Sequence, residues 1–333
     1  MRKGWLVWSS VLGVVWIKML CAEEIDGPVA TETESIWYQE ESCPYPELRK
    51  KFWPDKEDAS DCRHAHENGS WGVWMPEDPV IFQPFIADPR QVTYSAGWRF
   101  NDQVLNRNVI DISFGDTFPI YQWWDVWPGH GTMRIDLEGG LWAVFAPLKE
   151  TAPLINSDYY VGLVVTYALG PWSFRGRVYH ISSHIGDEYL IMHQEFCRKN
   201  PSAESVDIFA SYYITEDIRL YAGPGYVLHQ DHTFRCSRFY AECGAELYLN
   251  EVAYIDLDDH LYGVPFYGMH FRFRKNFKHH VDSTYVLGYE WAKTSGLCHK
   301  FRVFLEYHDG YSVEGQFCKL PTNYLAIRAS YGF

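Results

Sequence analysis

The stretch NYLAIRASYGF, residues 323–333, alternates between two kinds of side chain at every second position. One set is apolar and consists of Leu325, Ile327, Ala329, Tyr331 and Phe333. The other set carries the charge and consists of Tyr324, Ala326, Arg328, Ser330 and Gly332. Because successive side chains of a β-strand point to opposite faces, this period predicts a strand with one apolar face and one polar face.

The same period of two dominates the chain from Gln91 onward. Clear examples are the segments 218–229, 240–249, 266–274, 283–291 and 300–308. Their polar faces carry Arg219, Glu242, Glu246, His270, Arg272, Glu290, Arg302 and Glu306, and Arg328 follows in the last segment. The sign of the charge mostly alternates from one segment to the next, and on neighbouring antiparallel strands such side chains face each other. Exposed ion pairs contribute little to stability, so this order indicates an enclosed polar lumen.

These patterns predict an all-β fold, a transmembrane antiparallel up-and-down barrel of about fourteen strands. The expected strands are 91–100, 108–115, 117–124, 131–138, 140–147, 158–168, 172–185, 205–214, 218–227, 240–249, 262–274, 281–293, 299–308 and 323–333. Twelve strands is the alternative, because Pro119 and the strands near it are weak. A tight turn is expected near Glu138 and Gly139. An even number brings both ends of the barrel to one side of the membrane.

Residues 1–22 have the features of a secretory signal peptide. Arg2 and Lys3 precede a short apolar run, and Ala22 offers a small residue for cleavage. The apolar run is shorter than the roughly 20 residues that a membrane-spanning helix requires. The chain is therefore expected to be exported.

Residues 23–90 are expected to form an acidic periplasmic extension that could plug the barrel formed by residues 91–333. The terminal Phe333 resembles the last residue of bacterial outer-membrane barrels, which the outer-membrane assembly machinery reads. The net charge of −14 and the lack of a basic stripe argue against a nucleic-acid partner.

Seven cysteines follow the signal peptide: Cys43, Cys62, Cys197, Cys236, Cys243, Cys298 and Cys318. In an exported chain some of them should form disulfides, and the near pairs are Cys43 with Cys62 and Cys236 with Cys243. An odd count leaves one cysteine free or linked to another envelope protein. A zinc site at Cys62, His64 and His66 is the alternative for that segment.

The stretch YHISSHIGDEYL, residues 179–190, is the richest in groups that do chemistry. His180, Ser182 and His184 share one strand face, and we expect them to point into the lumen near the outer mouth. The arginines just upstream have the opposite parity, so this placement requires a change of facing or a bulge near Val178.

Three interpretations of this stretch stay open. Lumen-lining residues in a hydrogen-bonded network or a constriction are the first. A hydrolase is the second, with His180 as base, Ser182 as nucleophile and Asp187 or Glu188 orienting the imidazole; outer-membrane lipases carry a similar pair, facing the lipid. A metal site at His180, His184 and Glu188 is the third, although same-face residues four apart on a strand lie roughly 13 Å apart.

Four segments carry a resemblance to a known family: IADPRQ at 86–91, ISFGDTFPIY at 112–121, YHISSHIGDEY at 179–189 and RLYAGPGY at 219–226. Together they resemble an uncharacterised bacterial family, a domain of unknown function known mainly from chlamydiae and their relatives. The resemblance covers about residues 80–333. It implies an outer-membrane barrel, adds no activity, and fits disulfide-linked envelope partners.

The leading functional hypothesis is an outer-membrane diffusion channel or transporter for small polar solutes, with no cofactor and no bound metal. Its selectivity would come from the charged residues of the polar faces, together with the 179–190 stretch. The alternatives are a lipid esterase or deacylase that uses His180 and Ser182, and a structural or adhesive disulfide-linked envelope protein. The expected partners are outer-membrane lipid and lipopolysaccharide.

Overall fold

The computed structural model describes residues 71–76, 80–256, 261–275, 281–293 and 299–332. All of them belong to the unit Tyr45–Phe333. Several predictions concern residues outside these ranges: the signal peptide, the Cys43–Cys62 pair, the zinc alternative at His64 and His66, and Phe333. Within the described ranges, no helix combines the length and the apolar character needed to cross a membrane.

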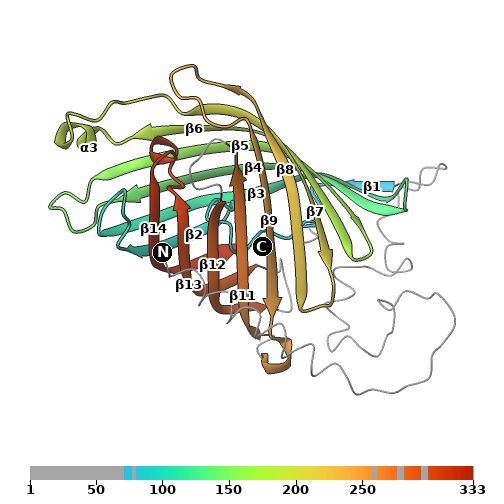
Figure 1. Ribbon diagram of the computed structural model, residues 1–333. Coiled ribbons are helices and arrows are strands. Elements are labelled where there is room, and N and C mark those ends of the chain that lie inside the picture. Colours follow the sequence, from blue (N-terminus) through green and yellow to red (C-terminus); the bar gives the residue numbers. More distant parts are fainter. Residues whose placement is uncertain (1–70, 77–79, 257–260, 276–280, 294–298, 333) are drawn as a thin grey trace. The chain divides into compact units, whose positions relative to one another are not determined.

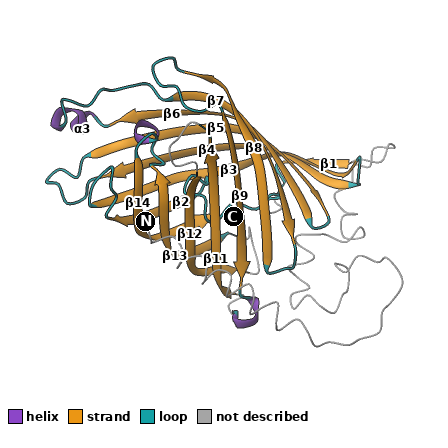
Figure 2. Ribbon diagram, viewed as in Figure 1, coloured by secondary structure: helices purple, strands orange, loops and turns teal. Residues whose placement is uncertain are grey.

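In the described chain, twelve antiparallel strands close into a barrel (Figure 1, Figure 2). Each strand pairs with its neighbours along the chain, and β14 closes the ring by pairing with β2. The barrel strands are β2 (Tyr94–Phe100), β3 (Asn108–Val126), β4 (Gly131–Phe145), β5 (Leu154–Leu169), β6 (Trp172–Ile185), β7 (Ser202–Tyr213), β8 (Ile218–Gln230), β9 (Phe239–Tyr248), β11 (Leu261–Arg274), β12 (Val281–Lys293), β13 (Lys300–Tyr311) and β14 (Pro321–Gly332). Two short strands, β1 (Trp71–Trp74) and β10 (Tyr254–Asp256), pair with β3 and β11 outside this ring. The predicted all-β antiparallel barrel is confirmed.

The ring has twelve strands, the alternative count, because two pairs of expected strands are each one long strand. Residues 108–124 lie within β3, and residues 131–145 lie within β4. Gly139, which suggested a turn, instead pairs with Asp116 in the middle of the sheet. Pro119 is tolerated because it lies beside a register shift, where the ladder is already irregular.

The barrel wall is apolar outside and polar inside, as the terminal strand shows most clearly. Leu325 and Ile327 are 47% and 50% exposed, whereas Ala326 and Arg328 between and after them are buried. Other exposed apolar side chains of the strands include Leu163, Val165, Val178, Ile208, Leu220, Leu287 and Leu305. A sandwich in water buries its apolar positions instead. This reversal is what a wall in contact with acyl chains requires.

The interior is occupied by the segment 80–92 and by charged side chains. The Arg219 guanidinium donates to two carbonyl oxygens of this segment at 2.7 and 3.1 Å. Phe85 is fully buried and stacks on the Tyr221 ring with centroids 3.8 Å apart. The Arg175 guanidinium lies 4.5 Å from the centroid of the Phe85 ring. Aromatic stacking and cation–π contacts therefore hold the segment against the inner wall.

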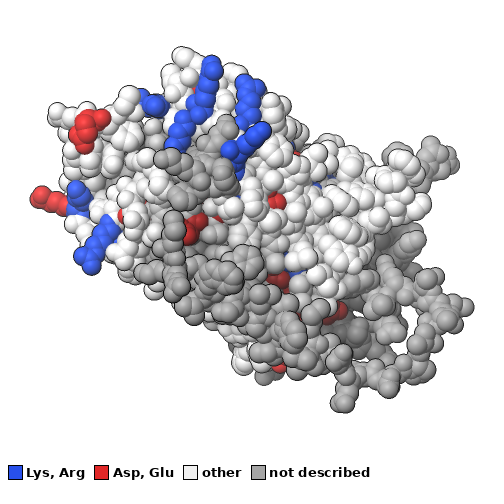
Figure 3. Space-filling view, viewed as in Figure 1, with Lys and Arg blue, Asp and Glu red and all other residues white. Residues whose placement is uncertain are grey.

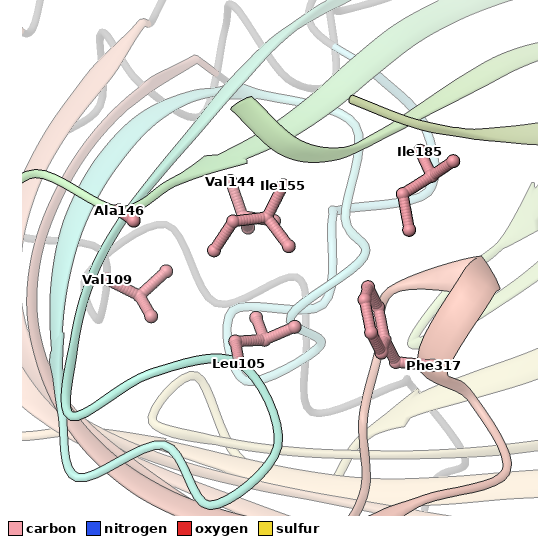
Figure 4. Close-up of a cluster of buried hydrophobic side chains, with 7 residues drawn as sticks. All are labelled: Leu105, Val109, Val144, Ala146, Ile155, Ile185 and Phe317. Carbon is pink, nitrogen blue, oxygen red and sulfur yellow. The ribbon is translucent and has the colours of Figure 1, made fainter. Parts of the chain in front are cut away.

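One end of the barrel, called here the loop end, carries the connections that follow alternate strands of the meander. These connections are 101–107, 146–153, 186–201, 231–238 and 312–320. They include the short helices α3 (Asp187–Met192) and η4 (Gly315–Phe317), while η3 (Asn250–Val252) lies at the opposite end. Residues 312–320, the cap loop, fold inward. Their Phe317 joins a buried apolar cluster with Leu105, Val109, Val144, Ala146, Ile155 and Ile185 (Figure 4).

Ion pairs with Arg99 and Arg90 hold the cap loop in place. Glu314 is buried and lies 2.8 Å from the Arg99 guanidinium. Burial alone would raise the pKa of Glu314, but the positive charges of Arg99 and Arg90 hold this pKa below its ordinary value. Arg90 also donates to the carbonyl oxygen of Val313 at 2.8 Å and pairs with Asp158. The cap loop is thus held by the apolar cluster around Phe317 and by the ion pairs of Arg99 and Arg90.

Candidate functional site

Strand β6 keeps one facing along its whole length, and this decides where the 179–190 stretch points. Arg175 faces the interior and is 3% exposed, whereas Val178 is 56% exposed on the outer face. Neither neighbouring strand shows a register shift against β6. His180, Ser182 and His184 share the parity of Val178 and therefore lie on the outer face. The predicted inward orientation of these three residues is wrong, because the buried arginines, which need the polar interior, set the facing of the entire strand.

The partner of His180 is Glu204 on the adjacent strand β7. The two residues lie directly opposite each other in the register. Nδ1 of His180 is 2.9 Å from Oε1 of Glu204. Asp187, the orienting residue suggested from the sequence, is instead exposed in the first turn of α3. Sequence reasoning missed Glu204 because only the strand register brings it beside the histidine.

A second histidine, His229 of β8, approaches Glu204 from the other side. Its Nδ1 is 2.7 Å from Oε2 of the same carboxylate. The β7–β8 ladder shifts register here, so that Glu204 pairs with His229 while the next residue, Ser205, pairs with Val227. A β-bulge of this kind re-aims a side chain. Glu204 therefore accepts from two imidazoles, one on each side.

Ser182 and His180 have both polar and apolar residues as neighbours on the adjacent strands. Across the ladders it faces Tyr159 of β5 and Ser202 of β7, while His180 faces Val161. On the face seen in Figure 3, exposed Lys and Arg gather toward the end that carries α3. The cluster of Ser182, His180 and Glu204 lies near the loop end, toward the end of β6 and the start of β7.

This arrangement can activate a serine. When Nδ1–H of His180 donates to Glu204, the other ring nitrogen, Nε2, is left as an acceptor. Same-face residues two apart on a strand lie about 7 Å apart at their Cα atoms, within reach of a histidine side chain. Nε2 can then take the proton of the Ser182 hydroxyl, in the division of roles that nucleophile, base and orienting carboxylate have in serine hydrolases.

The other predicted site residues point inward and form ion pairs. The pairs are Arg219–Glu246 at 3.0 Å, Arg272–Glu242 at 3.1 Å, Arg302–Glu290 at 2.7 Å and Arg328–Glu306 at 3.0 Å. Arg328 also pairs with Asp111 at 2.7 Å, a partner that the sequence did not reveal. With the exception of Arg272, these side chains are almost wholly buried. The four Arg–Glu pairs each join two neighbouring strands, whereas the Arg328–Asp111 pair links β14 and β3 past β2.

One inward cluster has the donor set of a metal site. Asp88 of the 80–92 segment, Glu242 of β9 and His270 of β11 each offer a ligand atom, and these atoms lie within 4.8 Å of one another. A nitrogen and two carboxylate oxygens suit zinc or a similar divalent cation. Glu242 is already engaged by Arg272, which supplies the compensating charge without an ion.

Comparison with known proteins gives one family and a common fold. The model of a family described as "Protein of unknown function (DUF1207)" matches residues 44–333. No curated protein matches the chain. The chain is similar in structure to outer membrane phospholipase A from Escherichia coli, at 11% identity over 72% of this chain and 91% of that chain, with a TM-score of 0.47. A Salmonella typhi outer membrane phospholipase dimer with bound calcium gives 10% identity, 73% and 93% coverage and a TM-score of 0.48.

The NanC porin is also similar, at 12% identity over 73% of this chain and all of that chain, with a TM-score of 0.39. The barrel thus resembles those of bacterial outer-membrane proteins. Phospholipases and porins stand together among these structures, so the likeness does not choose between an enzyme and a channel.

Proposed function

The chain belongs to the DUF1207 family of unknown function, and from this premise we propose that it is an outer-membrane hydrolase of lipid acyl esters. In this proposal Ser182 is the nucleophile, His180 the general base and Glu204 the residue that orients the imidazole. The observation that carries the proposal is the hydrogen bond of 2.9 Å between His180 and Glu204, on the same outer face as Ser182.

The position of the cluster matches the chemistry of the substrate. The ester bonds of a membrane lipid lie where the acyl chains end and the polar headgroups begin. Val178, which lies two residues before His180 on the same face of β6, is exposed, and so is Ile208 on β7. An acyl chain can lie along these side chains while its ester carbonyl reaches Ser182. A serine facing the lumen would have no such access.

The reaction proceeds through a covalent intermediate. His180 takes the hydroxyl proton as Ser182 attacks the carbonyl carbon, and the imidazolium returns this proton to the departing alcohol. Water, activated by the same imidazole, then releases the fatty acid from Ser182. The Glu204 carboxylate stabilises the imidazolium in both steps.

The filled interior favours the hydrolase over the diffusion channel. Arg134, Arg219, Phe85 and Phe209 are among the largest fully buried side chains of the described residues. The 80–92 segment and the cap loop occupy the lumen between them. A solute path would require this packing to move, whereas the outer-face cluster lies on the side of the wall that faces lipid.

The test is turnover by the refolded full chain in mixed micelles. We expect hydrolysis of a phospholipid with a fluorescent acyl chain, and labelling of one serine by a fluorophosphonate probe. Ser182→Ala should abolish both signals. Ser283→Ala is the matched control, since Ser283 also lies on the outer face, on β12. Absence of turnover in the parent protein, or undiminished turnover in Ser182→Ala, refutes the proposal.

A further inference from the structure

Two cysteines that are 82 residues apart in the sequence meet at the loop end. Cys236 belongs to connection 231–238, and Cys318 belongs to the cap loop. Their sulfur atoms are 3.6 Å apart. The near pair expected from the sequence, Cys236 with Cys243, is not the pair that the fold favours, because Cys243 lies within β9.

Both cysteines are held in place by their surroundings. The Gln230 side chain accepts from the backbone N–H of Cys236 at 2.9 Å and donates to its carbonyl oxygen at 3.3 Å. Arg274 donates to the carbonyl oxygen of Cys318 at 3.4 Å. Next to it, the Lys319 ammonium lies 4.2 Å from the Phe234 ring centroid, which joins the two loops a second time. The sulfurs therefore meet because two ordered backbones bring them together.

A disulfide needs only a small further approach. The S–S bond is about 2.05 Å long, so the two sulfurs have to close by roughly 1.5 Å. We propose that Cys236 and Cys318 are the site of a disulfide that locks the cap loop into the mouth of the barrel.

The electrostatics divide the roles between the two thiols. Hydrogen bonding with Cys318 lowers the pKa of Cys236 to about 7, and the nearby charges of Lys319 and Arg274 act in the same direction. The pKa of Cys318 is raised, first by its hydrogen bond with Cys236 and then by burial. In this proposal Cys236 is the attacking thiolate, and Cys318 is the thiol that resolves the intermediate.

The oxidant in this proposal is a thiol oxidase that carries its own disulfide. The Cys236 thiolate attacks one sulfur of that disulfide, so that a mixed disulfide forms and the other oxidase sulfur leaves as a thiolate. Cys318 then loses its proton and attacks the Cys236 sulfur, which expels the second oxidase thiolate. Two thiols of the barrel lose two electrons and two protons, and the oxidase disulfide becomes a dithiol.

The bond would immobilise the loop that closes the barrel. Cys318 directly follows Phe317, which fills the apolar cluster of the loop end. Gln316 donates to the carbonyl oxygens of Ser183 and Lys199 at 3.0 and 3.1 Å. These contacts alone can open transiently, whereas a covalent link to connection 231–238 keeps the cap loop in place while they re-form.

The experiment is peptide mapping by mass spectrometry of the full chain, refolded and treated with oxidised glutathione, after all free thiols have been alkylated. We expect a cross-linked pair of peptides that contains Cys236 and Cys318. The pair should be absent in Cys236→Ser and in Cys318→Ser, and it should persist in Cys197→Ser, because Cys197 lies exposed in another connection. This control shows that the cross-link does not depend on the exposed thiol of Cys197.

Limited proteolysis supplies a second readout on the unchanged sequence. Reduction of the parent protein should accelerate cleavage within residues 312–320 at least tenfold, with the barrel strands still protected. The proposal is overturned if both thiols are alkylated in the oxidised protein, if either is bonded to a different cysteine, or if reduction leaves the cleavage rate of the cap loop unchanged.

Discussion

The replacement Glu204→Gln tests the link between barrel register and activity most directly. The carboxylate accepts from His180 at 2.9 Å and from His229 at 2.7 Å, one imidazole at each oxygen. Glutamine keeps the size of the side chain but removes its charge and one of the two acceptor oxygens. The imidazole of His180 then loses the negative charge that stabilises its protonated form, and it competes with His229 for the one acceptor oxygen that remains.

The expected loss follows from the kind of hydrogen bond that is removed. A hydrogen bond to a charged group contributes about 1.5–3 kcal/mol, and at about 1.4 kcal/mol per tenfold in rate this corresponds to a fall in kcat/KM of about 10- to 150-fold. Stability should change much less. His180 and Glu204 are 41% and 43% exposed, and exposed pairs of this kind contribute about 0.2–1 kcal/mol.

The assay is release of a fluorescent fatty acid in mixed micelles, with the melting temperature followed on the same samples. The matched control is Asp187→Asn, because Asp187 is the orienting residue that the sequence suggests and the fold places elsewhere. Activity should survive in Asp187→Asn. If Glu204→Gln retains activity within twofold of the parent, or if Asp187→Asn is the variant that loses it, then the triad derived from the strand register is incorrect.

Three further predictions follow from the interior and the loop end. Arg328→Met should lower the free energy of unfolding by about 3–5 kcal/mol in denaturant titrations, because Glu306 is left buried without its counter-charge and Asp111 keeps only Arg99. Phe85→Ala should weaken the docking of the 80–92 segment by about 3–5 kcal/mol, seen as cleavage of this segment by protease at least about 100-fold faster. Alkylation of the reduced protein at Cys236 should be half-maximal near pH 7, since the thiolate reacts and its pKa is lowered to about 7.

Each of these measurements has an outcome that contradicts its reasoning. Arg235 is an exposed arginine of the loop end, and Arg235→Met should change the free energy of unfolding by less than about 0.5 kcal/mol. If Arg235→Met destabilises the protein as much as Arg328→Met does, then burial of the ion pair is not the reason for the loss. Protease resistance of the 80–92 segment in Phe85→Ala would show that the ring is not its anchor. An alkylation midpoint for Cys236 well above pH 8 would contradict the charge arrangement at the cap loop.

The sequence by itself determined the barrel. Alternation such as that of residues 323–332 records the pleat of a strand, which is a property of the chain alone, so the fold class and the apolar outer face were predictable. The same reasoning failed for the glycine at 139, because a glycine at a turn and one within a long strand look alike in sequence.

The tertiary structure decided which face of β6 meets the lipid and which residue stands beside His180. The alternation of side chains along the strand shows that His180 and Ser182 share a face, but it does not show which face this is. The structure decides it, because Arg175 is buried against the 80–92 segment and His180 and Ser182 have the opposite parity. The position of Glu204 depends on the register of β6 with β7 and on the bulge between β7 and β8. The pairing of Cys236 with Cys318 depends on how two connections fold at the loop end. These are contacts between residues far apart in the chain, and the period of a single strand carries no information about its neighbour.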